Sequence, residues 1–392
     1  MAEASPLPNT DAAPHQGLVP PPLKIIPTCS NNFCGKLAPG YELPQLQCEL
    51  IEKLGGGSYG EVWLVKLISN GDRYVVKIYD KRREYQRAAH RECKVLHQLR
   101  DTPGVINMLA NCKANTGCCE HICILMPFFP MSLCDFIEKS HVPPKISEGL
   151  QTQIRSLLQA LQAIHVKKIL HADLKPENIL IDATGTIAIC DFGSACFTDG
   201  LHQELMTSPA YRAPELMPEP HDELVLQYST ASDVWALGCL LVELVTGKLL
   251  FNEGGDKAVR KVQTNMISNI QKEFAALYVP SEVDELVSFF TPFFQLKPDE
   301  RGKIETILNH SFLRGSASSA AVDDSLASSA AVSKKRRITG AEPIAKTSRI
   351  HDLLHGTSTS PVSFRLCPFA QLMGTPPFMR KILDEFLSNK YL

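Results

Sequence analysis

The segment His171–Asn178 has the residue types and spacing needed to move a phosphoryl group. It reads His-Ala-Asp-Leu-Lys-Pro-Glu-Asn, and Asp191 opens an Asp-Phe-Gly triplet further along the chain. In such a reaction Asp173 would orient a hydroxyl and accept its proton, while Lys175 would neutralise the moving phosphoryl group. Asn178 and Asp191 offer oxygen ligands for a metal. The pattern therefore predicts phosphoryl transfer from a magnesium nucleotide to a hydroxyl.

A glycine-rich stretch upstream, Gly55–Val62, is suited to cover the phosphates of that nucleotide. Gly55, Gly57 and Gly60 let a hairpin backbone close over phosphates without side-chain obstruction. The stretch lacks the Gly-Lys-Ser/Thr ending of a P-loop, and no strand-to-helix dinucleotide turn follows it. Alone it is also compatible with a turn that binds no ligand, so its function depends on the residues around it.

Lys77 lies inside the apolar β-type run Tyr74–Ile78. A lysine is expensive to bury without a partner, and binding to phosphates together with a steadying carboxylate removes that cost. In the following helical segment Glu92 is the preferred partner, because it has the better apolar phase with Leu96 one turn later. Glu84 is the alternative carboxylate, and a lysine that snorkels from an edge strand is the alternative structure.

The bulk composition is that of an ordinary globular chain. Of its 392 residues 44% are hydrophobic and 21% charged, and the formal net charge is -2. This length allows one large or two medium domains. The charge makes no global case for a nucleic-acid or membrane partner, and we expect neither. The longest apolar run, Ile122–Pro130, is too short to span a bilayer, and we do not expect the polar, proline-rich segment Met1–Gln16 to be a secretory signal.

The 13 cysteines indicate a reducing, intracellular environment. Most stand singly in apolar runs, as buried small hydrophobic residues do. A metal site is conceivable where four cysteines and His121 gather between Cys112 and Cys123. That cluster lacks paired Cys-x-x-Cys spacing and falls in an expected strand hairpin, so structural cysteines are the preferred interpretation.

Apolar periodicity divides the central part of the chain into two regions. The first has short β-type runs interrupted by one helical segment, Tyr85–Leu99, which predicts a small, mostly antiparallel sheet with a helix against it. From Leu133 to about Leu313 the spacing is helical, and the stripe Leu150–Ile164 predicts a buried helix face. The expected strands are Cys48–Leu54, Glu61–Leu67, Tyr74–Tyr79, Val105–Cys112 and Ile122–Met126.

Both ends of the chain differ in composition from this centre. Residues 1–45 are proline-rich and predict a disordered leader. Residues 314–360 predict a low-complexity Ser/Ala linker, in which Lys334–Arg337 resembles a nuclear-import signal that an import receptor would bind, or is plain linker charge. Residues 361–392 predict an amphipathic tail that packs on its own domain or on a partner.

Taken in order, these stretches resemble the protein kinases over residues 46–313. The glycine-rich stretch comes first, followed by the Lys77–Glu92 pair, and then by His171–Asn178 and the Asp191 triplet. This is the order found in that family, and Ala213–Glu215 closes an activation segment. Asp233–Gly238 and Arg301 complete the resemblance. It implies an α+β fold with a small, mostly antiparallel β lobe carrying one main helix and a larger helical lobe. It also implies ATP and Mg²⁺ as cofactors and proteins as substrates.

Specific roles follow from the resemblance, and Leu174–Asn178 matches its serine/threonine pattern rather than the tyrosine pattern. Catalytic roles fall to Asp173, Lys175, Lys77 and Glu92, and metal binding to Asn178 and Asp191. Nucleotide binding falls to Leu54, Gly55, Gly57, Gly60, Val62, Val75, Lys77, Met126, Pro127, Phe128 and Leu180. Supporting roles are expected for Ser208 beside Asp173 and Lys175, Asp233 under the catalytic loop, Glu215 paired with Arg301, and a stack of Leu96, Leu109, His171 and Phe192.

The segments His171–Asp173, Asp191–Ala195 and Tyr211–Glu215 resemble the CMGC group, near the dual-specificity tyrosine-regulated, pre-mRNA-processing and homeodomain-interacting kinases. Leu205 stands where these relatives carry a tyrosine that they phosphorylate themselves. Ala172 replaces an arginine that other kinases pair with an activation-loop phosphate, and alanine cannot make that pair. Activity independent of loop phosphorylation is therefore expected.

Arg212 is the residue that bears on substrate choice. In the group, an arginine there satisfies a backbone carbonyl and leaves a pocket that tolerates proline after the phosphorylated residue; a plain surface arginine is the alternative. Two other functions remain open. A pseudokinase scaffold that recruits partners through its tail is disfavoured because Lys77, Asp173, Asn178 and Asp191 are all present. A small-molecule kinase is disfavoured by Ala213–Glu215 and Asp233–Trp235, because in the protein kinases these segments build a peptide-binding lobe. We expect a nuclear or cytoplasmic location.

Overall fold

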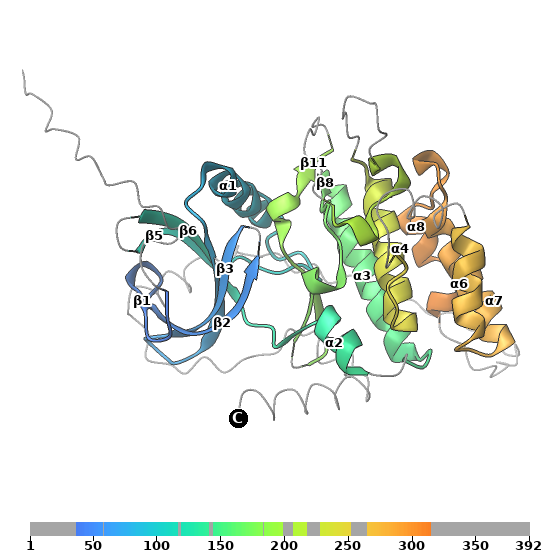
Figure 1. Cartoon of the computed structure of the whole chain (residues 1–392), viewed down its shortest axis with the longest axis horizontal. Helices are drawn as coiled ribbons and strands as arrows, with labels where there is room; N and C mark the ends of the chain where they lie inside the picture. The colour runs from blue at the N-terminus through green and yellow to red at the C-terminus, as the bar shows by residue number, and fades with distance from the viewer. Residues whose placement is uncertain are drawn as a thin grey trace, which may run out of the picture.

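The computed structural model describes residues 37–57, 59–116, 119–140, 144–182, 184–198, 207–217, 228–251 and 265–314. These residues form two lobes, a sheet with one helix against it and a larger group of helices (Figure 1). Most of the predicted leader, the linker with Lys334–Arg337 and the amphipathic tail lie outside the described residues. No helix of the described part is long and apolar enough to cross a membrane.

The small lobe is a six-stranded sheet in which every neighbouring pair of strands is antiparallel. Its strand order is β1-β2-β3-β4-β6-β5, and α1 (Arg83–Gln98) is its helix. This confirms the expected mostly antiparallel sheet with one main helix. The strands are β1 (Glu42–Leu43), β2 (Cys48–Gly57), β3 (Gly60–Leu67), β4 (Arg73–Tyr79), β5 (Ala110–Thr116) and β6 (Cys119–Pro127).

The observed strands begin or end one to five residues away from several predicted boundaries, and two of these differences matter for the fold. The strand expected over Val105–Cys112 begins only at Ala110, since Val105 instead bridges in parallel to Ile189 and the Ile106 N–H donates to the Ile189 carbonyl at 3.0 Å. That apolar run joins the two lobes before it enters the sheet, where the Leu109 N–H donates to the Leu125 carbonyl of β6 at 2.8 Å. The fold also starts before residue 46, because β1 and the 3-10 turn Pro44–Leu46 bury a leucine each.

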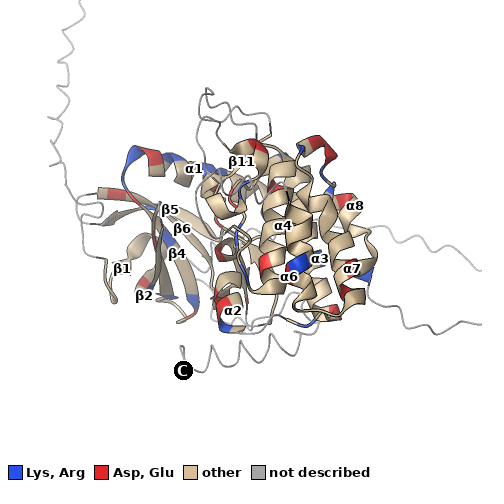
Figure 2. Ribbon diagram, turned by 45° about the vertical axis from the view of Figure 1, so that its right-hand side comes forward, with Lys and Arg blue, Asp and Glu red and all other residues tan. Residues whose placement is uncertain are grey.

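The large lobe is built on two buried helices. Helix α3 (Glu148–Val166) begins where the Ser147 hydroxyl accepts the Leu150 N–H at 3.3 Å, and its predicted stripe is buried. Helix α4 (Thr230–Thr246) is buried on nearly all sides, and Figure 2 shows few charged residues along it. Around them lie α2 (Leu133–Ser140), α6 (Met266–Ala275), α7 (Pro280–Phe290) and α8 (Ile304–Leu308).

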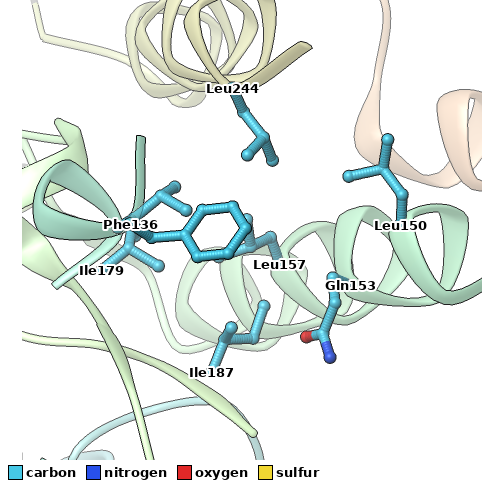
Figure 3. Close-up of a pocket in the computed structure, with 8 residues that line it drawn as sticks. Phe136, Leu150, Gln153, Leu157, Ile179, Ile187 and Leu244 are labelled. Atoms are coloured by element: carbon cyan, nitrogen blue, oxygen red, sulfur yellow. The ribbon is translucent and has the colours of Figure 1, made fainter. Parts of the chain in front are cut away.

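Short strands flank His171–Asn178 and the segment that begins at Asp191. They are β7 (Met131–Ser132), β8 (Ile169–Leu170), β9 (Ile179–Ile181), β10 (Ile187–Ile189) and β11 (Cys196–Phe197), paired as β10-β9-β7 and β11-β8. Beneath them an apolar cavity of about 20 Å³ lies between Phe136, Leu157 and Leu244 (Figure 3). A space of that size holds no more than about one water molecule, so it is a packing gap and not a ligand site.

Candidate active site

Asp173 lies in the loop between β8 and β9. Its carboxylate is held by Lys175 of the same loop and by Ser208 of the activation segment. Its Oδ1 accepts the backbone N–H of Ser208 at 3.0 Å and the Ser208 hydroxyl at 2.7 Å. Its Oδ2 accepts Lys175 Nζ at 2.8 Å, and Lys175 also donates to the Ser208 hydroxyl at 3.1 Å. Burial opposes charge on Lys175, but the hydrogen bond and charge of Asp173 act together with the charges of Glu177 and Asp191 to raise the lysine pKa. The expected contact of Ser208 with both residues is present.

The backbone before Asp173 is fixed from below by α4. Asp233, which is buried, accepts the N–H groups of His171 and Ala172, each at 2.9 Å, and the Nε2 of His165 lies 2.9 Å from it. Burial alone would raise the Asp233 pKa, but the interactions with His165 and His171 together keep it below its usual value. Asp233 thus anchors the catalytic loop, as the resemblance implied.

Lys77 lies between two carboxylates that come from different lobes. Its Nζ is 2.8 Å from Glu92 Oε2 on α1 and 2.8 Å from Asp191 Oδ1. Burial disfavours the charged lysine, yet the charges of Asp191 and Glu92 outweigh it and raise the Lys77 pKa. For Glu92 burial dominates and its pKa is raised. Glu84, the alternative partner, is exposed at the start of α1.

Asp191 and Asn178 supply oxygens that fit Mg²⁺. Asp191 has a φ of 60°, and its carboxylate accepts the Gly193 N–H at 3.3 Å. Burial would raise the Asp191 pKa, but Lys77 outweighs it, so the pKa is lowered and the group is a carboxylate. Asn178 donates its amide N–H to the Asp173 carbonyl at 2.8 Å, which leaves its amide oxygen for a metal. Carboxylate and amide oxygens are the ligands Mg²⁺ prefers.

The glycine-rich stretch forms the turn between β2 and β3. At Gly60 a Cβ would lie 2.1 Å from the Ile78 carbonyl oxygen, so only glycine allows this close packing on β4. At Gly55 a Cβ would meet nothing within 4 Å, which leaves open space beside the backbone. The remaining residues of the predicted nucleotide site lie nearby in the sheet register, where Val62 pairs with Lys77 and Val75 with Met126.

Other predicted nucleotide contacts lie at the junction of the lobes. Pro127 ends β6, and Phe128 follows it. Leu180 lies in β9 and is half-buried, as is Leu54 in β2. Leu180 and Val75 both pack against the main hydrophobic core. The predicted nucleotide residues thus lie in β2, β3, β4, β6 and β9 and in the segments next to them, and their contact with a nucleotide stays a prediction.

In the predicted stack of Leu96, Leu109, His171 and Phe192, the assignment of Leu109 is wrong. The rings of His171 and Phe192 lie 4.9 Å apart, and Leu96 belongs to the same core as Phe192. Leu109 packs instead against the second core on the other side of the sheet, whereas its neighbour Met108 packs against the first. Adjacent residues of extended chain point to opposite faces, so a one-residue error exchanges the two sides.

The described part of the activation segment is fixed to the large lobe. Arg301, fully buried, donates to both carboxylate oxygens of Glu215 at 2.8 and 3.0 Å, as expected. Arg212 is buried and donates to the Thr207 carbonyl at 3.0 Å, so it is not a plain surface arginine. Leu205 lies outside the described residues.

The described cysteines of the cluster, Cys112, Cys119 and Cys123, are not joined in disulfides. Within the described ranges no three His, Cys, Asp or Glu side chains are grouped to hold a metal ion. His121 is buried, with Nδ1 2.7 Å from the Tyr79 carbonyl oxygen.

Two contacts of the site were not foreseen from the sequence. The Tyr59 hydroxyl lies 3.0 Å from the Ser194 hydroxyl, and Arg91 donates to the Gly193 carbonyl at 3.1 Å. A tyrosine in a glycine-rich turn gives no sequence signal of its partner, since that partner lies 135 residues away.

These elements are those of a protein kinase. The family model "Protein kinase domain" matches residues 48–313, and the chain belongs to that family. A solved kinase domain has a TM-score of 0.58 and 23% sequence identity, over 71% of this chain and 98% of that one, and shows the same fold. The expected two-lobed kinase fold is confirmed.

The similar curated proteins lie in the branch that the sequence indicated. Dual specificity tyrosine-phosphorylation-regulated kinase 3 of Rattus norvegicus is 34% identical over 52% of this chain and 34% of its own length. Serine/threonine-protein kinase prpf4B of Dictyostelium discoideum is 33% identical over 52% of this chain and 25% of its own. The chain thus matches about a third or less of these relatives.

Proposed function

We propose that this chain transfers the γ-phosphate of MgATP to serine and threonine hydroxyls of proteins. The observation that carries the proposal is the convergence of Lys77, Asp173, Asn178 and Asp191 in one site. MgATP, when bound, supplies the activated phosphoryl group. Names of the relatives, which include serine/threonine and dual-specificity kinases, support the same reaction.

The chain's own residues divide the work of the reaction. Asp173 orients the substrate hydroxyl and takes its proton, and Lys175 offers positive charge beside it. Lys77 binds nucleotide phosphates and is kept charged and in place by its two carboxylate partners. Asn178 and Asp191 hold the metal. Because these groups are already fixed by hydrogen bonds, little reorganisation is needed at the moment of transfer.

Phosphate transfer to a generic basic protein tests the proposal. Wild type should transfer phosphate in the presence of Mg²⁺ or Mn²⁺, and Asp173→Asn should lose nearly all of that activity because an amide cannot accept the proton. Absence of transfer by wild type with either metal would favour a scaffold that recruits partners through its tail.

We further propose a preference for proline after the phosphorylated residue. Arg212 already satisfies the Thr207 carbonyl, which is the type of contact this preference requires. A degenerate peptide library should show enrichment of proline at that position. An array with no gain from proline would remove this part of the proposal.

Activity should not depend on a phosphate in the activation loop. Ala172, buried beside Asp233, has no side chain with which to bind one. Treatment of the purified enzyme with a broad phosphatase should leave most of the turnover. An almost complete loss would contradict this expectation.

A nuclear location through Lys334–Arg337 is a separate proposal. Four consecutive basic residues support recognition by an import receptor. Replacement of all four by alanine should shift a fluorescent fusion of the full chain from nucleus to cytoplasm. An unchanged distribution would show that the cluster is linker charge.

A further inference from the structure

Tyr59 connects the glycine-rich stretch to the turn that carries Asp191. Its hydroxyl forms a 3.0 Å hydrogen bond with the hydroxyl of Ser194, whose side chain is buried. Its ring lies against Gly193, where a Cβ would come within 3.2 Å of the ring. The glycine-rich stretch and the turn that carries Asp191 are thus in direct contact.

The rest of the residue is held as well. The Asp80 N–H donates to the Tyr59 carbonyl at 2.9 Å, which ties the backbone to the end of β4. The ring of Tyr85 on α1 meets the Tyr59 ring edge-on at 5.9 Å. Lys77 Nζ lies 5.7 Å from the centre of the Tyr59 ring. Tyr59 therefore contacts the sheet, the helix and the metal-binding turn together.

The turn at Gly193 and Ser194 is gripped from a second side by α1. Arg91 donates to the Gly193 carbonyl at 3.1 Å, one residue before the glutamate that pairs with Lys77. The turn is thus fixed by Arg91 and Tyr59. Ala172 cannot add a charged contact to the activation loop that follows this turn. These two contacts hold Asp191 near Lys77 without a phosphate.

We propose that Tyr59 is a positioning residue for phosphoryl transfer. Through its bond with Ser194 it holds the glycine-rich stretch down on the Asp191 turn and so preorganises the phosphate site for MgATP. This inference rests on the proposed function, because it presupposes that a magnesium nucleotide binds there. It assigns Tyr59 to the positioning of the nucleotide phosphates and not to proton transfer at Asp173, whose carboxylate is held by Lys175 and Ser208.

The expected effect is a loss of nucleotide affinity with little change in turnover. A hydrogen bond of this kind corresponds to about a two- to tenfold change in an equilibrium constant. Tyr59→Phe and Ser194→Ala should each raise the Kd for MgADP and the KM for ATP by that factor. The double variant should be no worse than either single, because both remove the same bond. The kcat should change by less than about twofold.

Calorimetric titration of the full chain with MgADP measures the Kd directly and needs no turnover. The matched control is Tyr41→Phe, which removes another tyrosine hydroxyl of the same lobe, bonded to the Asn115 carbonyl at 3.3 Å. It should leave the Kd unchanged. Hydrogen exchange without nucleotide should be faster in peptides covering residues 55–63 of Tyr59→Phe than in wild type.

The outcomes separate the inference from the function on which it rests. If wild type binds MgADP but neither single variant weakens binding, or if their effects simply add, the positioning role is wrong and the kinase proposal stands. A fall in kcat with unchanged KM would likewise overturn it. A wild-type chain that binds no nucleotide would overturn both.

Discussion

The backbone N–H of Ala172 donates to Oδ1 of Asp233 at 2.9 Å, and Ala172 has a φ of 63°. A residue with a Cβ pays about 1 kcal/mol or more for this left-handed conformation, so the surrounding contacts must enforce it. Asp233 does so from a buried position on α4 and also accepts the neighbouring His171 N–H. The catalytic aspartate, Asp173, follows directly, so its place depends on this anchor.

Replacement of Asp233 by asparagine should therefore damage stability and activity together. An amide would present an N–H₂ group to one of the two backbone donors and leave that donor unpaired in the interior. We expect the free energy of unfolding to fall by about 1–3 kcal/mol, measured by urea denaturation. Asp284→Asn, at an exposed position of α7, is the control and should change it by less than about 0.5 kcal/mol. Equal effects of the two variants would contradict an anchoring role.

The choice of Glu92 over Glu84 as partner of Lys77 gives a second prediction. Glu92→Gln removes a buried charge 2.8 Å from Lys77, whereas Glu84→Gln alters an exposed side chain of the same helix. We expect Glu92→Gln to lower kcat/KM by about 10–100-fold, which corresponds to the loss of one charge-assisted hydrogen bond. Steady-state kinetics with both variants should show a near-normal Glu84→Gln enzyme. A normal Glu92→Gln enzyme would refute the pairing's role.

Most residues of the candidate site can be predicted from residue types and their order in the sequence. The remaining contacts depend on tertiary packing and cannot. Lys77, Asp173 and Asp191 could be predicted because a buried lysine and ordered carboxylates have few other uses. The Tyr59–Ser194 bond could not, since it depends on how the two lobes meet. Leu109 was assigned to the wrong face because strand register is ambiguous by one residue in an apolar run.

The Glu215–Arg301 pair predicts a large stability effect from a conservative change. Arg301 is fully buried and also donates to the carbonyls of Ala231 and Gln295, so its planar group is used in several directions. Lysine cannot reproduce this geometry. Arg301→Lys should lower the free energy of unfolding by about 3 kcal/mol, measured by chemical denaturation.

A matched comparison for that variant lies nearby on the surface. Lys297 pairs with Glu300 at 2.9 Å, but both side chains are exposed. Lys297→Ala should therefore cost less than about 1 kcal/mol. If Arg301→Lys were as mild as Lys297→Ala, the buried pair would not be what fixes the activation segment to the large lobe.

The buried His121 predicts a loss of stability in mild acid. Burial lowers its pKa below the ordinary value of 6.5, so the unfolded chain takes up the proton at a higher pH than the folded one. The stability that the neutral ring provides is present above about pH 6.5 and falls as the pH drops through the folded-state pKa. Urea denaturation from about pH 7.5 to 5.5 should show this fall, and His121→Gln should flatten it. The slope that remains belongs in part to His310, whose pKa burial also lowers. An unchanged slope in His121→Gln would show that His121 does not titrate with unfolding in this range.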